Sequence, residues 1–115
     1  MAVLSVDVLF DMAIRIMLAE RSISITFAHD SILIKFPTTR RLAEFLEVPH
    51  YYVLPYFAMM EQEELVTRAE RVGIMTTVKG SRKIIDSMRE KYQRETEEIL
   101  GASVFQEIIK KFSPQ

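Results

Sequence analysis

Apolar residues recur at helical spacing through the stretch from Thr38 to Gly80. These positions are Leu42, Ala43, Leu46, Val48, Val53, Phe57, Met60, Leu65 and Val66. A spacing of three to four residues is typical of one buried helix face, so the pattern predicts helices over about 39–47 and 49–63. The turn at Val48-Pro49 joins the two, because proline suits the first position of a helix.

Before this stretch, residues 22–36 alternate between apolar and polar. The apolar positions are Ile23, Ile25, Phe27, Ile32, Ile34 and Phe36. A period of two with β-branched residues favours strands, here arranged as a hairpin. Pro37 ends the second strand, and Thr38 or Thr39 then offers a hydroxyl that can cap the next helix.

Two further strand-like runs follow at 65–69 and 74–78. Gly73, in the loop between them, can adopt the positive φ that a tight hairpin requires. Helical spacing then returns over about 80–112, where Thr77 or Ser81 can cap the first helix. Gly101 weakens or breaks the helical run.

The terminal helices predict a homodimer. Residues 3–20 form a helix that is apolar on nearly all sides, with one polar stripe of Asp7, Asp11 and Arg15. A helix of this kind is buried on more than one side, and a chain of 115 residues offers little protein to cover it. A second apolar stripe near the C-terminus consists of Val104, Phe105, Ile108, Ile109 and Phe112.

Length and charge narrow the possible classes of protein. At 115 residues the chain has the size of one domain over 1–115, and its net charge of −1 gives no overall attraction to nucleic acid. Residues 35–83 hold eight basic and six acidic side chains, a local charge of +2. The absence of cysteine excludes disulfides and thiolate chemistry and fits a cytoplasmic protein. Charged residues interrupt the N-terminal apolar run short of the ~20 residues that a membrane span needs, so no membrane association is expected.

Catalytic and metal-binding chemistry has little support. No Ser/His/Asp set has plausible spacing, and the chain has only three glycines, so no glycine-rich phosphate loop is present. The two histidines are far apart in the sequence, and we therefore expect no metal site and no cofactor. Carboxylate pairs such as Glu61 with Glu64 predict a solvated helix face. The chain is not expected to be an enzyme.

The most specific motif in the chain is LAEFLEVPHYYV…F…M…LV, followed by TVKG at 77–80. Over roughly residues 3–92 this pattern resembles the winged helix–turn–helix family, whose element order is helix, strand, helix, helix, strand, wing, strand, helix. It is most similar to dimeric MarR-like and PadR-like regulators, with the subfamily left open. The resemblance implies a mainly helical α+β fold with the helix–turn–helix at about 39–63, a wing at about 65–78 and outer helices for dimerisation.

The resemblance also implies a function. In this family the second helix of the motif enters the major groove, while arginines elsewhere hold phosphates. The chain is thus expected to bind double-stranded DNA as a homodimeric transcriptional regulator; whether a small effector also binds is left open. The matching positions are Tyr51, Tyr52, Pro55, Ala58 and Gln62 for bases, Arg40 and Arg41 for phosphates, and Arg68 and Arg71 on the wing, with Lys79, Arg82 and Lys83 just beyond.

The second helix itself leaves an alternative open. It has no Lys or Arg, and with Val53, Phe57 and Met60 buried, its outward residues are Tyr51, Pro55 and Gln62. Among these, only Gln62 is a good base reader. Proline lacks an N–H and crowds the carbonyl four residues back, so the helix should kink or tighten at Pro55.

The alternative function is protein docking. His50, Tyr51, Tyr52 and Tyr56 can form an aromatic-polar patch. All four are candidate DNA contacts, since tyrosines can hydrogen-bond phosphates, but tyrosine is also favoured at protein interfaces. The arginines have a second interpretation as well. Arg40 and Arg41 could be merely solvated, and Arg68 and Arg71 could pair with Glu70 and its neighbours instead of tracking a DNA groove.

Overall fold

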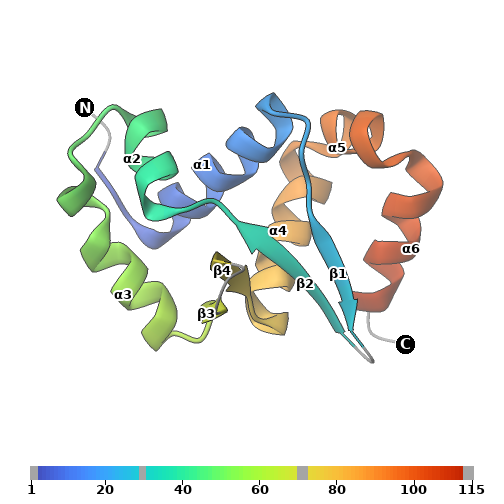
Figure 1. Ribbon diagram of the computed structural model, residues 1–115. Helices are drawn as coiled ribbons and strands as arrows, with labels where there is room; N and C mark the ends of the chain where they lie inside the picture. The colour runs from blue at the N-terminus through green and yellow to red at the C-terminus, as the bar shows by residue number, and fades with distance from the viewer. Residues whose placement is uncertain (1–2, 29–30, 70–72, 113–115) are drawn as a thin grey trace.

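The computed structural model describes residues 3–28, 31–69 and 73–112 (Figure 1). Within these residues the chain forms six α-helices, one 3-10 turn and a four-stranded antiparallel sheet, so the α+β class is confirmed. In chain order the elements are α1 (Val6–Ala19), β1 (Ile25–Ala28), β2 (Ser31–Phe36), α2 (Thr39–Leu46), η1 (His50–Tyr52), α3 (Leu54–Gln62), β3 (Val66–Ala69), β4 (Gly73–Thr76), α4 (Val78–Lys91), α5 (Gln93–Leu100) and α6 (Ala102–Phe112). Helices α2 and α3 lie at one end and α5 and α6 at the other, with α1, α4 and the sheet between them (Figure 1).

Three phenylalanines tie the elements together in the core. The ring centroids of Phe10 and Phe36 lie 5.1 Å apart, and those of Phe36 and Phe57 lie 5.8 Å apart in an edge-to-face arrangement. These buried residues belong to α1, β2 and α3. Aromatic pairs in such geometry are more favourable than their buried area alone predicts. The contact therefore holds α3 against α1 and β2.

The sheet joins two hairpins in the order β1-β2-β4-β3. Strand β2 pairs with β4, which places Phe36 opposite Ile74. Both predicted hairpins are confirmed, and Gly73 has the predicted positive φ, 105°. Strand β1 lies at an edge of the sheet, and its Phe27 is 61% exposed.

Helix α1 is covered by its own chain, since it packs against α2, α3, α4 and α5. Its buried residues are Leu9, Phe10, Ala13, Ile14, Ile16 and Met17. In α6, Phe105 and Ile108 are buried in the same core. The buried residues of α1 and α6 therefore need no second copy to cover them, because α4 and α5 fold back onto α1 and Phe105 and Ile108 pack into the core. Val104 of the predicted stripe stays exposed, and the homodimer stays a prediction.

The polar stripe of α1 also finds partners in its own chain. The Lys83 Nζ donates to the carboxylate of Asp7 at 2.6 Å, and the Tyr92 hydroxyl donates to Asp11 at 2.6 Å. The Arg15 Nε donates to the Tyr92 oxygen at 3.1 Å. Burial, and next the hydrogen bond to Asp11, raise the pKa of Tyr92. The hydrogen bond and charge of Lys83 lower the pKa of Asp7.

The prediction of one continuous helix over 49–63 is wrong. The chain forms η1 first and then α3, with Pro55 in the first turn of α3. Proline is tolerated there because the first turn of a helix has N–H groups without intrahelical partners. The tightening expected near Pro55 is present as the 3-10 turn. Val53, Phe57 and Met60 are buried, as predicted.

Helices α2 and α4 begin at hydroxyl caps that the sequence predicts. The Thr38 Oγ1 accepts from the Arg41 N–H at 3.1 Å, and the Thr77 Oγ1 accepts from the Gly80 N–H at 3.1 Å. A β-carbon at Gly80 would lie 2.0 Å from the carbonyl oxygen of Leu65. Only glycine fits this close approach of α4 to the residue before β3 without a backbone shift.

Helices α1, α2 and α3 are each followed by a left-handed residue. These residues are Arg21, Glu47 and Glu64, with φ of 51°, 57° and 60°. After α2, the N–H of Val48 reaches the carbonyl of Ala43, and the N–H of Glu47 reaches that of Glu44. This is the Schellman pattern, in which glycine is preferred because it lacks a β-carbon.

Replacing Glu47 by glycine is expected to stabilise the protein by about 1 kcal/mol, because a left-handed conformation costs an L-residue roughly 1–2 kcal/mol. Glu47→Ala is the matched control, since it removes the same carboxylate and keeps the β-carbon. Thermal unfolding of both variants measures the difference. Equal melting temperatures for the two variants would contradict the strain assigned to this turn.

Candidate nucleic-acid interface

Helix α2, η1 and α3 form a bent unit with an open outer side. Helices α2 and α3 both pack on α1, and η1 contacts both of them. On the outer side Tyr51 is 65% exposed, and Pro55 and Gln62 are exposed as well. The outward orientation predicted from the buried face of the second helix is thus confirmed.

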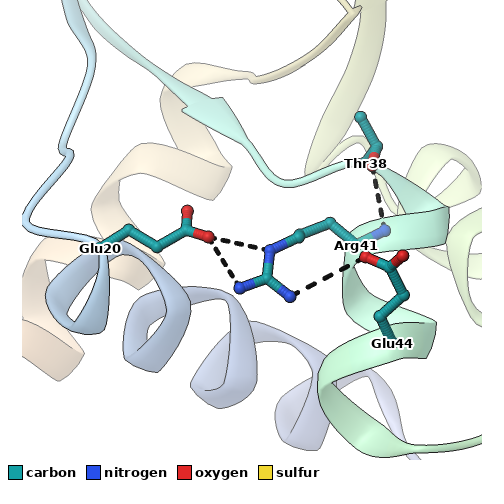
Figure 2. A network of polar contacts seen from close by, with 4 residues as sticks. All are labelled: Glu20, Thr38, Arg41 and Glu44. Carbon is teal, nitrogen blue, oxygen red and sulfur yellow. Dashed lines mark hydrogen bonds and ion pairs between the residues drawn. The ribbon is translucent and has the colours of Figure 1, made fainter.

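The two neighbouring arginines of α2 differ in their contacts. Arg40 is exposed and makes no ion pair with the described residues. Arg41 lies in a polar network with three other residues (Figure 2). Its Nε and Nη2 donate to Oε2 of Glu20 at 2.9 and 2.7 Å, and its Nη1 lies 3.9 Å from Oε1 of Glu44. Of the two phosphate candidates, only Arg40 is free to bind an anion without giving up a contact.

The predicted wing arginines also differ. Arg68 lies on β3, where its Nε is 3.5 Å from Oε2 of Glu61 at the end of α3. The side chain is mostly exposed, so this pair is weak and open to exchange. Arg71 lies outside the described residues.

The four residues of the predicted aromatic-polar patch separate in the structure. The rings of Tyr51 and Tyr52 meet edge to face at 4.9 Å, and both are exposed. The His50 Nε2 lies 2.6 Å from the Thr39 Oγ1, which ties η1 to the first turn of α2. Tyr56 is half-buried and lines a neighbouring groove. Tyr51 and Tyr52 therefore form the exposed part of the patch.

Further apolar side chains are exposed on α2 and α3, which the pattern of buried positions did not single out. These are Phe45, Leu54 and Met59. By helical spacing only Met59, two residues after Phe57, lies off the buried face; Phe45 and Leu54 are three residues from Leu42 and Phe57, so spacing gave no signal for their exposure. Together with Tyr51 and Tyr52, these exposed side chains of α2, η1 and α3 are here called the outer patch; among them, Met59 also lines the groove that Tyr56 lines. The acidic residues Glu61, Glu63 and Glu64 are exposed at the C-terminal end of α3.

Three basic residues in the N-terminal half of α4, Lys79, Arg82 and Lys83, line an open groove of about 710 Å³ beside α3. The Lys83 Nζ is bound to Asp7, and the Lys79 Nζ donates to the backbone carbonyl of Glu63 at 3.0 Å. The Arg82 guanidinium lies 5.9 Å from the centroid of the Phe112 ring. Each of these cations therefore already has an intramolecular partner.

The described residues hold no group of three or more His, Cys, Asp or Glu placed to bind a metal ion. None of their helices is long and apolar enough to cross a membrane. No family model, curated protein or solved structure matches the chain. A function is therefore inferred from the residues and their geometry.

Proposed function

We propose that the chain is a winged helix–turn–helix protein that binds double-stranded DNA as a transcriptional regulator. The observation that carries this proposal is the bent unit of α2, η1 and α3, whose second helix exposes a whole face next to the β3–β4 hairpin. Apart from the additional strand β1 and the 3-10 turn η1, the order α1, β2, α2, α3, β3, β4, α4 matches the order that the sequence resemblance implies, which supports the proposal.

The distribution of charge supports docking through the N-terminal half of this unit. Arg40 lies in the first turn of α2, where unpaired backbone N–H groups favour a phosphate. The acidic residues gather at the opposite end of α3, and Glu61 is partly neutralised by Arg68. Binding energy then comes mostly from phosphate contacts. Because Gln62 is the only good base reader, the specific-to-nonspecific ratio is expected near the low end of the usual ~10³–10⁷ range.

A second candidate function is protein docking through the outer patch. Two observations favour it. Five large apolar side chains are exposed on α2, η1 and α3. Among the described residues of these elements, Arg40 is the only arginine that makes no ion pair. Aromatic residues and methionine are enriched at protein interfaces. In this case the partner would cover Tyr51 and Tyr52 with an apolar surface.

We also propose that two copies act together, because a two-fold protein matches a pseudo-palindromic site. The apolar surface left for a second copy includes Val3 and Val104, which are 83% and 46% exposed. Both lie on the terminal segments that the resemblance assigns to dimerisation.

Light scattering is expected to give about twice the chain mass of 13.4 kDa. Val104→Glu should yield a folded monomer, because burying an unpaired charge in an interface is costly. Val78→Glu is the control, since Val78 is exposed to a similar extent on α4. A wild-type chain that stays monomeric at high micromolar concentration would rule out the dimer.

Arg40→Ala, Arg68→Ala and Arg71→Ala should each weaken binding to all DNA sequences about equally. Each lost phosphate contact should flatten the log–log salt dependence by about 0.9. Arg89→Ala serves as the control, because Arg89 lies in the last turn of α4 and faces Asp86. Fluorescence anisotropy across a salt series measures the slope. Wild-type affinity in the triple variant would exclude this docking mode.

Tyr51 separates the two functions, because DNA phosphates need its hydroxyl whereas a protein partner needs its ring. Tyr51→Phe should weaken DNA binding about tenfold, since a hydrogen bond to a charged group contributes about 1.5 kcal/mol. Tyr51→Ala should weaken it at least as much. Unchanged DNA affinity in both variants, with a captured protein lost only in Tyr51→Ala, would favour protein docking.

A further inference from the structure

The guanidinium of Arg41 is bound by acidic side chains on two sides (Figure 2). Two of its nitrogens donate to one oxygen of Glu20, at 2.9 and 2.7 Å, and the third lies 3.9 Å from Glu44. Glu20 is 21 residues away in sequence and belongs to the end of α1, whereas Glu44 is one turn along α2. The short contact to Glu20 is therefore tertiary, and the longer one to Glu44 is local.

Both ends of the Glu20–Arg41 pair are held by ordered backbone. After α1 the N–H of Ser22 reaches the carbonyl of Met17, and Arg21 takes a left-handed φ of 51°. This Schellman-type ending fixes the direction of the chain at Glu20. At the other end, Thr38 caps the backbone of Arg41 itself. The carboxylate is thus presented to the guanidinium by the fold.

A carboxylate and a phosphate compete for the same donors on an arginine. Both accept paired N–H groups from the planar guanidinium, in similar geometry. The side chains of Arg41 and Glu20 are 38% and 47% exposed, so an external phosphate can reach the pair. Arg40, the neighbouring residue, has no such internal acceptor among the described residues.

We propose that Glu20 occupies the position of a DNA phosphate on Arg41 and so keeps the affinity for DNA below what the basic residues of α2 would otherwise give. This inference rests on the proposed DNA-binding function. Arg40 then binds a phosphate directly, whereas Arg41 does so only after exchanging Glu20. Glu20 therefore acts as an internal competitor that sets the strength of sequence-independent binding.

Glu20→Gln tests the competition, because glutamine keeps the shape and removes the charge. A half-exposed ion pair of this kind corresponds to about a two- to fivefold change in an equilibrium constant. We expect Glu20→Gln to bind a short mixed-sequence duplex two- to fivefold more tightly and to steepen the log–log salt slope by up to about 0.9.

Glu44→Gln is the matched control, since it removes an equal charge beside the same guanidinium but breaks only the 3.9 Å contact. Arg41→Ala and the double variant Glu20→Gln/Arg41→Ala complete a double-mutant cycle. With Arg41 absent, the gain from Glu20→Gln should disappear. Thermal unfolding of every variant confirms that the affinities belong to folded protein.

Two results would overturn the role of Glu20 while leaving DNA binding intact. One is an equal gain from Glu20→Gln and Glu44→Gln, which would reflect net charge alone. The other is a gain from Glu20→Gln that persists without Arg41. If neither the wild type nor any folded variant binds the duplex at low salt, the proposed function itself fails, and the competition fails with it.

Discussion

Phe36 touches both Phe10 and Phe57, and the orientation of the exposed helix depends on this contact. It joins α1, β2 and α3, three elements from separate parts of the sequence. Because Phe57 must point into the core, the opposite face of α3 must point outward, together with Tyr51 on the preceding turn. The β3–β4 hairpin then follows directly from the end of α3 and is joined to β2 through β4. An interior aromatic contact thereby determines which surface can meet a partner.

The ends of the helices refine this arrangement. Left-handed residues after α1, α2 and α3 reverse the chain with charged side chains where glycine is preferred, which leaves strain at Arg21, Glu47 and Glu64. Glycine stands instead at Gly80, where a β-carbon would collide with the carbonyl oxygen of Leu65. Of these turns, the one after α1 has a second consequence, because it places Glu20 against Arg41. Backbone geometry and surface electrostatics are coupled at this point.

For nucleic-acid binding, a basic side chain counts only to the extent that it is not already bound to a group of its own chain. The central part of the chain has a small positive excess, yet Arg41, Lys79 and Lys83 bind groups of their own chain. Only Arg40 presents an unoccupied guanidinium on α2, and Arg68 makes a longer, exposed contact. This distribution supports weak, sequence-tolerant DNA binding. The outer patch explains why a protein partner is the second candidate.

The sequence by itself determined the features that depend on neighbouring residues. Hydrophobic spacing predicted α2 and the buried face of α3, and alternation predicted the β1–β2 hairpin. Two strand-like runs around Gly73 predicted the second hairpin, and hydroxyl positions narrowed the caps to Thr38 or Thr39 and to Thr77 or Ser81. It also located the outward face with Tyr51 and Gln62. Only the tertiary structure decided that α4 and α5 cover α1, that Pro55 lies in the first turn of a separate helix, and that Glu20 binds Arg41 while Arg40 makes no ion pair with the described residues. The physical reason is that caps, turns and periodicity act over a few residues, whereas burial and ion pairing depend on which distant elements the core brings together.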